Sequence, residues 1–220
     1  MNGEEFVAGL IDEMRRLFAH LGEHETLVAE SKGRVEIVTL LKLALASELE
    51  ACELAGFWLP TTPEMDAKAA FARQCGDEMK HYERIVERLA ELGEDVAGAD
   101  PLADGGYGPL YRYLKGLRTT VERIAGGPFA REAIAEVRNA QFIALCEQQG
   151  DERTARLYRE VIQPDEVEHH RLGRAVLARL CTTPETQLLA ATAARSTLAI
   201  ADELSTLAER ATGLHPIPVS

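Results

Sequence analysis

Apolar residues recur at intervals of three and four along most of the chain, which is the spacing of residues on one face of an α-helix. No segment alternates apolar and polar residues cleanly, and β-branched residues are scattered, so the pattern predicts no strand. Stretches rich in Gly and Pro separate the periodic segments. We therefore expect successive helices at about residues 3–21, 35–59, 63–92, 110–125, 129–148, 151–181 and 184–212.

The longest break in this pattern, residues 93–109, is rich in Gly, Asp and Pro. Such a composition is typical of an irregular connection, and its length allows the chain to cross from one end of a helix bundle to the other. A short turn near residues 60–63 pairs the two helices before this crossover, and a turn at Gly150 pairs two helices after it. Two helix pairs joined by one long crossover form the connectivity of ferritin-like bundles.

We therefore predict an all-α fold, a ferritin-like four-helix bundle with extra N- and C-terminal helices. Its core would span about residues 35–181. The flanking helices, at about 3–21 and 184–212, would cover faces of the bundle or form an oligomer contact. No composition boundary divides the chain, so we expect a single domain over residues 1–220.

Two prolines fall within otherwise helical sequence. The tripeptide "GGP" at 126–128 is expected to interrupt the helical segments on either side of it. Pro164 lies in the middle of the segment at 151–181, where it predicts a kink or a local bulge because proline donates no backbone hydrogen bond.

Composition and charge narrow the classes of function. Hydrophobic residues make up 46% of the chain and aromatic residues only 5%, a mixture that favours helices. A formal net charge of −12 argues against a broad nucleic-acid or anionic-membrane surface, without excluding tRNA. No stretch approaches the roughly 18 apolar residues needed to span a bilayer, and residues 1–18 indicate an amphipathic helix, not a secretion signal. The cysteines form no C-x-x-C pair, so we expect a reduced, cytoplasmic protein.

Candidate chemistry comes from two Glu-x-x-His motifs, Glu78 with His81 and Glu166 with His169. Residues i and i+3 lie on the same side of a helix, so both members of a motif can reach one ion. Each motif lies in the second helix of a predicted helix pair, at a similar distance beyond its turn. A dinuclear site in such a bundle also needs one Glu from each first helix.

In the first pair, Glu48 precedes Glu78 by 30 residues and interrupts an apolar stripe. A carboxylate inside such a stripe is costly unless it is neutralised, and metal coordination would neutralise it. The stripe consists of Leu41, Leu45, Cys52, Ala55 and Leu59.

In the second pair, Glu136 precedes Glu166 by the same 30 residues, and the repeated spacing favours it as the equivalent of Glu48. Glu132 lies 34 residues upstream of Glu166, one turn away on nearly the same face, and is the alternative.

Carboxylates and one imidazole per ion suit two divalent cations, with iron as the first expectation and manganese as the alternative. Because Pro164 can alter the phase of its helix, His170 is an alternative to His169. Asp165 and Glu168 would either support the imidazoles or be solvated charges, and the four cysteines are interpreted as buried apolar thiols. The predicted metal ligands are Glu48, Glu78, His81, Glu136, Glu166 and His169, with Glu132 and His170 as alternates.

Four segments carry a resemblance to a known family: "ASELEACELA", "CGDEMKHYER", "IAEVRNAQFI" and "ARLYREVIQPDEVEHH". They resemble the ligand helices of ferritin-like diiron-carboxylate proteins, and are most similar to the tRNA 2-methylthio-isopentenyladenosine hydroxylases and their relatives. The resemblance covers about residues 35–180. The resemblance implies that the six predicted ligands bind iron. It also implies that a reduced diiron centre activates oxygen. The chain departs from the hydroxylase pattern by one extra residue near Pro164, and its charge of −12 does not favour a tRNA substrate.

The functional hypothesis is a non-haem diiron oxidoreductase that activates O₂ or peroxide to hydroxylate or oxidise a small organic substrate. Its expected partners are that substrate, O₂, an electron-donor protein and a second copy of the chain in a homodimer. The alternative is iron handling of the ferroxidase type, or iron detoxification, without an organic substrate. A third hypothesis is a structural bundle that keeps the carboxylates without using them.

Overall fold

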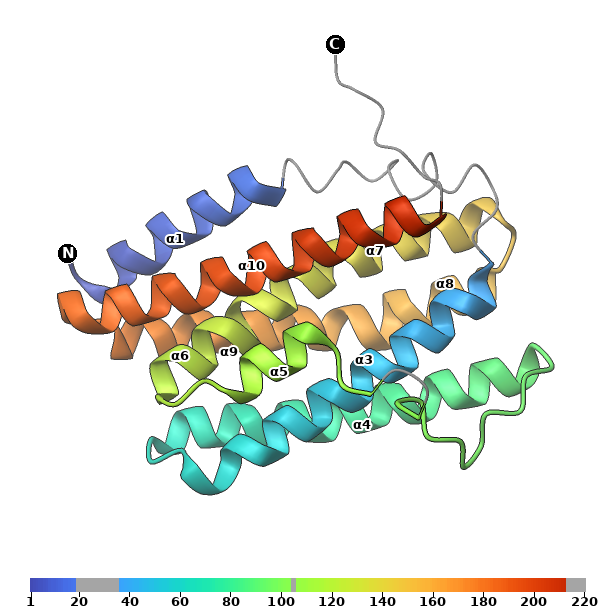
Figure 1. Cartoon of the computed structure of the whole chain (residues 1–220), viewed down its shortest axis with the longest axis horizontal. Coiled ribbons are helices and arrows are strands. Elements are labelled where there is room, and N and C mark those ends of the chain that lie inside the picture. Colours follow the sequence, from blue (N-terminus) through green and yellow to red (C-terminus); the bar gives the residue numbers. More distant parts are fainter. Residues whose placement is uncertain (19–35, 104–105, 213–220) are drawn as a thin grey trace, which may run out of the picture.

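The computed structural model describes residues 1–18, 36–103 and 106–212, and all regular structure among them is helical (Figure 1). The all-α prediction is therefore confirmed for these residues. The predicted helix positions at 19–21 and 35 lie outside them. In chain order the elements are α1 (Gly3–Phe18), α3 (Ile37–Trp58), α4 (Met65–Glu91), α5 (Pro109–Lys115), α6 (Thr120–Ile124), α7 (Glu132–Gln148), α8 (Glu152–Leu157), α9 (Gln163–Leu180) and α10 (Pro184–Thr212).

Two antiparallel helix pairs form the centre of the molecule. Helix α3 packs along α4, α7 packs along α9, and the pairs meet where α4 contacts α9. Helices α1 and α10 lie on the side of α7 and α9 that faces away from α4 (Figure 1). None of the described helices is long and apolar enough to cross a membrane.

A layer of polar side chains lies between two apolar clusters along the bundle. One cluster, near the α3–α4 turn, includes the fully buried Trp58 and Phe71. The other, near the α7–α8 turn, includes the fully buried Leu41 and Ile85. Burial of each such side chain stabilises the fold by about 1.5–3 kcal/mol. The clusters also exclude water from the polar layer between them.

The helix predicted at 110–125 is divided in the structure. Helix α5 ends at Lys115, and α6 begins after Thr119, whose hydroxyl accepts a hydrogen bond from the backbone N–H of Glu122. The Glu122 side chain accepts in return from the backbone of Thr119, which completes a capping box. This local motif starts a new helix, so the prediction of one continuous helix was wrong.

The interruption expected at 126–128 takes the form of a π-helical segment, Ala125–Arg131, which joins α6 to α7. Close packing explains the glycines there. A Cβ on Gly127 would lie 2.9 Å from the Trp58 ring, and one on Gly126 would lie 2.8 Å from a Leu114 methyl. Tertiary packing against a bare backbone therefore outweighs the poor helix propensity of this sequence.

The distortion expected at Pro164 is present as a second π-helical segment, Tyr158–Ile162, between α8 and α9. Pro164 lies two residues beyond the end of this segment within a continuous helix, where it donates no backbone hydrogen bond. The helix therefore gains a bulge, and the residues after it change phase relative to a regular α-helix.

Replacing Gly173 by Ala should destabilise the protein by about 1–3 kcal/mol, because the added Cβ would lie 2.8 Å from the backbone of Phe129 and Pro128. Backbone of a neighbouring helix cannot give way easily. Gly76→Ala is the matched control, since nothing lies within 4 Å of that position and Ala raises helix propensity by about 0.5–1 kcal/mol. Urea unfolding of both variants measures the difference, and equal midpoints would contradict the close contact.

Candidate metal centre

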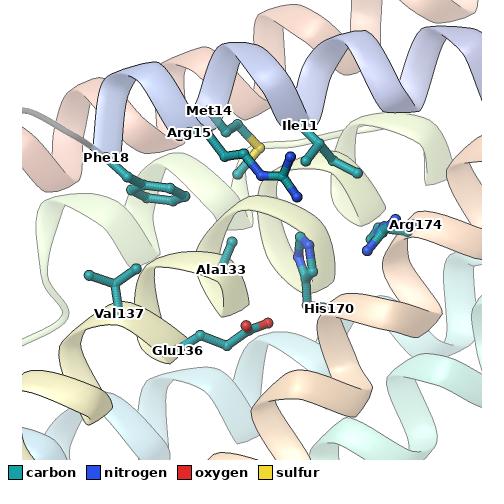
Figure 2. Close-up of a pocket in the computed structure, with 9 residues that line it drawn as sticks. All are labelled: Ile11, Met14, Arg15, Phe18, Ala133, Glu136, Val137, His170 and Arg174. Atoms are coloured by element: carbon teal, nitrogen blue, oxygen red, sulfur yellow. The ribbon is translucent and has the colours of Figure 1, made fainter.

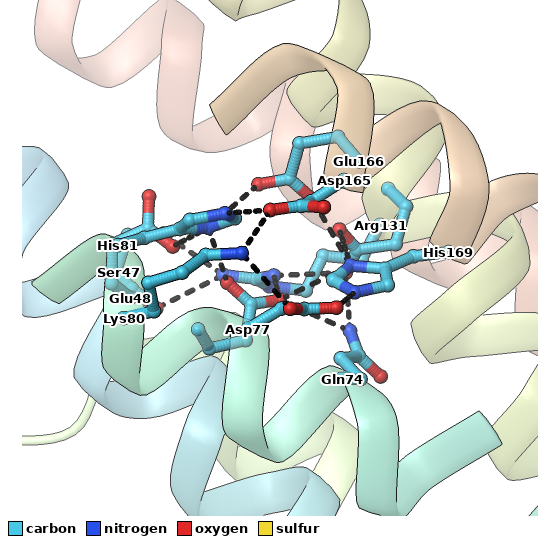
Figure 3. A network of polar contacts seen from close by, with 12 residues as sticks. Ser47, Glu48, Gln74, Asp77, Lys80, His81, Arg131, Asp165, Glu166 and His169 are labelled. Atoms are coloured by element: carbon cyan, nitrogen blue, oxygen red, sulfur yellow. Dashed lines mark hydrogen bonds and ion pairs between the residues drawn. The ribbon is translucent and has the colours of Figure 1, made fainter. Parts of the chain in front are cut away.

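Six side chains form the centre of the polar layer, and Figure 3 shows the network of polar contacts around them. Each has 7% or less of its surface exposed. Charged groups buried this deeply must be neutralised by one another, by protons or by a bound cation. The six are Glu48 on α3, Glu78 and His81 on α4, Glu132 on α7, and Glu166 and His169 on α9.

Ligand atoms from these side chains form two overlapping groups, and within each group all of the atoms lie within 4.8 Å of one another. Glu78 and Glu166 belong to both groups. The first group adds Glu48 and His81, and the second adds Glu132 and His169. Each group could therefore hold a metal ion, and the two groups share two carboxylates.

The imidazoles lie at opposite ends of the cluster (Figure 3). The Nδ1 atom of His81 is 3.5 Å from oxygens of both Glu48 and Glu78. The Nδ1 atom of His169 is 3.5 Å from Glu166 and 3.8 Å from Glu132. These distances are too long for good hydrogen bonds.

Unpartnered atoms indicate what the site fits. Five of the six side chains have a buried polar atom that lacks a hydrogen-bond partner. Leaving such an atom unpartnered in a protein interior costs free energy. The same five residues are members of the two groups, so a divalent ion among them would satisfy the missing contacts. The unpartnered atoms are Oε2 of Glu78, Glu132 and Glu166 and Nδ1 of His81 and His169.

The carboxylates repel one another in this dry layer. Burial, reinforced by the charges of Glu132 and Glu48, raises the pKa of Glu78 to about 8. Burial and the charges of Glu132 and Glu78 raise the pKa of Glu166 well above its ordinary value. Without a cation, Glu78 therefore holds a proton at neutral pH, and the charged form of Glu166 is disfavoured.

The imidazoles are also protonated without a cation. Burial disfavours their charged form, but the close carboxylates outweigh it. Glu48 and Glu78 raise the pKa of His81 to about 11, and Glu132 raises the pKa of His169 to about 9. A metal ion must displace these protons, so its binding should be stronger at higher pH.

Two aspartates contact the imidazoles at Nε2, the ring nitrogen that does not face the cluster. The Nε2 atom of His81 is 3.1 Å from Asp165, and that of His169 is 3.2 Å from Asp77. Each Asp precedes the Glu of its own motif and supports the His of the other. Lys80 joins them by donating to Asp165 at 2.6 Å and to Asp77 at 3.1 Å. Such contacts turn Nδ1 toward the cluster and fix the ring orientation.

The sequence carried a signal for this support, because both motifs read Asp-Glu-x-x-His: "DEMKH" and "DEVEH". Of the two roles considered for Asp165, the structure gives it contact with an imidazole. Glu168 is instead ion-paired with Arg171 at the helix surface. Asp77 was missed, although it occupies the same motif position as Asp165.

Two further polar residues were also missed. Gln74 lies one turn before Glu78, and its amide donates to Glu132 at 2.7 Å and to Glu78 at 3.3 Å. Arg131 donates to Glu132 at 3.0 Å and anchors itself to the backbone and hydroxyl of Ser47. Arg131 thereby supplies a fixed positive charge beside the carboxylates, a contact that no spacing in the sequence indicates.

Glu132, not Glu136, completes the cluster, so the preference for Glu136 is corrected. The preference for Glu136 assumed that the same number of residues separates the facing ligands in both helix pairs. The first pair is joined by residues 59–64, which include a 3₁₀ turn, whereas the second is joined by residues 149–151 and contains the π-helical segment Tyr158–Ile162. The spacing in one pair therefore does not specify the spacing in the other.

Glu136 and the alternate His170 line a pocket of about 240 Å³ between α1, α7 and α9 instead (Figure 2). The His170 ring stacks on Phe129 with ring centroids 5.2 Å apart, and its Nδ1 lies 2.7 Å from the Phe129 carbonyl oxygen. His169 is thus the imidazole that faces the cluster. Apolar side chains of α1, among them Ile11 and Met14, form the opposite wall of the pocket.

Replacing Asp165 by Asn should weaken metal binding at the His81 end by about 10–100-fold, because a neutral amide supports the imidazole less well than a carboxylate. Asp77→Asn should act in the same way at His169. Glu168→Gln is the control, since its carboxylate pairs with Arg171 and not with an imidazole. Titration against a chelator of known affinity measures the loss, and equal affinities for the Asp165 variant and the control would contradict the assignment.

Comparison of the chain with protein-family models, with curated proteins and with solved structures finds no match.

Proposed function

We propose that the protein is a ferritin-like diiron-carboxylate oxidoreductase that uses O₂ or peroxide to hydroxylate or oxidise a small organic substrate. The observation that carries the proposal is the pair of overlapping four-ligand groups that share Glu78 and Glu166. Two helix pairs linked by a long crossover, with ligands from all four helices, support the ferritin-like assignment.

The donor set favours iron, with manganese as the second choice. Each ion would be held by one imidazole, by one carboxylate of its own and by the two shared carboxylates. Hard oxygen donors without a thiolate suit iron or manganese better than a structural zinc site. When bound, two ferrous ions would supply the electrons that reduce O₂.

The protein's own residues would hold and isolate the reaction. Asp77 and Asp165 orient the imidazoles, and Lys80 joins the two aspartates. Gln74 and Arg131 fix Glu132 by hydrogen bonds. The apolar clusters on both sides exclude water, which strengthens electrostatic interactions within the site.

A binding site for an organic substrate would distinguish this function from iron handling alone, and one pocket is a candidate for it. The pocket lined by Glu136 and His170 lies one helical turn from Glu132 and has room for a small, partly apolar molecule. The free thiols support a reducing, cytoplasmic location, where an electron-donor protein could re-reduce the centre.

The test begins with metal-free protein loaded with two equivalents of Fe²⁺ under anaerobic conditions. On exposure to O₂, we expect rapid O₂ consumption, two ions retained per chain, and repeated consumption when a chemical reductant is added. Particle mass is measured in parallel. Release of ferric iron or growth of a mineral core would favour the ferroxidase alternative. O₂ consumption no faster than that of free Fe²⁺ would overturn both readings.

A further inference from the structure

Two cysteines face each other beside the metal cluster. The Sγ atoms of Cys52 on α3 and Cys75 on α4 are 3.6 Å apart, and both are free thiols. Cys52 lies one turn after Glu48, and Cys75 lies three residues before Glu78, so the pair sits about one helical turn from the cluster, toward the α3–α4 turn. The sequence interpretation of these residues as buried apolar thiols does not anticipate this contact.

The glycine at position 56 leaves space beside the Cys75 sulfur. A disulfide needs a separation of about 2.05 Å, so the atoms must approach by roughly 1.5 Å. Gly56 follows Cys52 by one turn, and even an added Cβ there would be 3.6 Å from the Cys75 sulfur. No side chain from that position blocks rotation of the Cys75 thiol.

Exposure differs between the two thiols in a way that suits sequential chemistry. Cys52 is only 7% exposed, whereas Cys75 is half-buried and can meet a small oxidant from solvent. Burial, reinforced by the neighbouring Cys75, raises the pKa of the Cys52 thiol to about 12. Cys75 is therefore the thiol that a peroxide reaches first, and Cys52 is placed to react second because its sulfur lies 3.6 Å away.

We propose that Cys52 and Cys75 are a redox-active pair that hydrogen peroxide oxidises to a disulfide linking α3 and α4. In the first step the Cys75 sulfur attacks one oxygen of peroxide, the O–O bond breaks, and the departing hydroxide takes a proton to become water. Cys75 is then a sulfenic acid. Cys52 attacks the Cys75 sulfur and displaces its hydroxyl group, which takes the Cys52 proton and leaves as a second water.

Atoms and electrons balance in this sequence. Two thiols and one peroxide give one disulfide and two waters, and the two sulfur atoms supply the two electrons that reduce the peroxide. A thiol reductant would reverse the change by exchange. The disulfide would join the two helices that carry Glu48, Glu78 and His81, close to the site where the proposed function would generate or use peroxide.

The test uses the full-length chain after treatment with chelator and reductant, so its outcome does not depend on the proposed metal chemistry. One equivalent of hydrogen peroxide is added, remaining thiols are alkylated, and peptides are mapped by mass spectrometry. We expect loss of two of the four thiols, a peptide that links Cys52 to Cys75, and full recovery with dithiothreitol.

Matched variants separate this pair from the other thiols. A Cys146→Ser, Cys181→Ser double variant keeps the pair and should still lose two thiols. Cys75→Ser should leave Cys52 reduced at the same peroxide concentration. The proposal is overturned if the linked peptide is absent, if Cys75 proceeds to sulfinic acid while Cys52 stays reduced, or if Cys75→Ser loses thiols as fast as the unmodified chain.

Discussion

Replacing Glu78 by Gln is expected to abolish binding of both metal ions, whereas replacing Glu48 by Gln should remove only one. Glu78 belongs to both four-ligand groups, while Glu48 belongs to the first alone. An amide oxygen lacks the negative charge that lets a carboxylate hold two cations. Replacing the shared Glu78 should therefore reduce metal affinity by more than the roughly 100-fold typical of residues that only support a ligand. Metal content after gel filtration should be two ions for the unmodified chain, one for Glu48→Gln and none for Glu78→Gln.

The same experiment decides between the two candidate carboxylates of α7. Glu132→Gln should retain one ion, and Glu136→Gln should retain two, because Glu136 faces the pocket beside α1 and lies outside both groups. Circular dichroism and unfolding midpoints establish that each variant is folded. If Glu136→Gln loses an ion and Glu132→Gln does not, the placement of α7 given by the structure is contradicted.

The choice between Glu132 and Glu136 shows why part of the site could be predicted from the sequence and part could not. The spacing of Glu78 and His81 within one motif depends only on the geometry of a regular helix, which holds in α4. Partners on different helices depend on the turns and bulges between them. The π-helical segment just before Glu132 is set by tertiary contacts, including the Trp58 ring against Gly127, and no local pattern encodes these.

Other differences came from local signals that the sequence did contain. Thr119 and Glu122 form a Thr-x-x-Glu capping box, which marks the start of α6 and divides a segment predicted as one helix. Asp77 and Asp165 occupy the same position in two copies of one motif, so comparing the copies would have found both supports. The contact between Cys52 and Cys75, in contrast, depends on how α3 and α4 are rotated against each other, which spacing along one helix does not fix.

The metal-free protein is expected to lose stability as pH rises from 6.5 to 8, and the metal-loaded protein is not. Glu78 has an ordinary pKa of 4.5 when unfolded and about 8 when folded, and His169 goes from 6.5 to about 9. Both pKa values are raised by folding, so each group contributes stability that is present below its unfolded pKa and lost as pH rises through its folded pKa. Across this window the native state holds protons that the unfolded state has released.

For each proton that the native state holds and the unfolded state has released, the free energy of unfolding falls by about 1.4 kcal/mol per unit rise in pH. Glu132 does not offset this loss. Its pKa is lowered because contacts with Glu166, Arg131 and His169 outweigh the effect of burial. A lowered pKa contributes stability that is constant above pH 4.5 and is lost only at lower pH.

Bound metal should reverse the pH dependence, because the cation takes the place of the protons on Glu78 and the two imidazoles. Thermal unfolding between pH 6.5 and 8, with and without two equivalents of Mn²⁺, measures both slopes, and Mn²⁺ avoids oxidation during heating. Glu166→Gln is the control: it removes one buried carboxyl whose charged form is disfavoured by burial and by the charges of Glu132 and Glu78, so the metal-free variant should be more stable than the unmodified chain at pH 8 and should vary less with pH. A metal-free stability that rises with pH across this window would contradict the mutual repulsion of these carboxylates, and with it the reason that the site needs a cation.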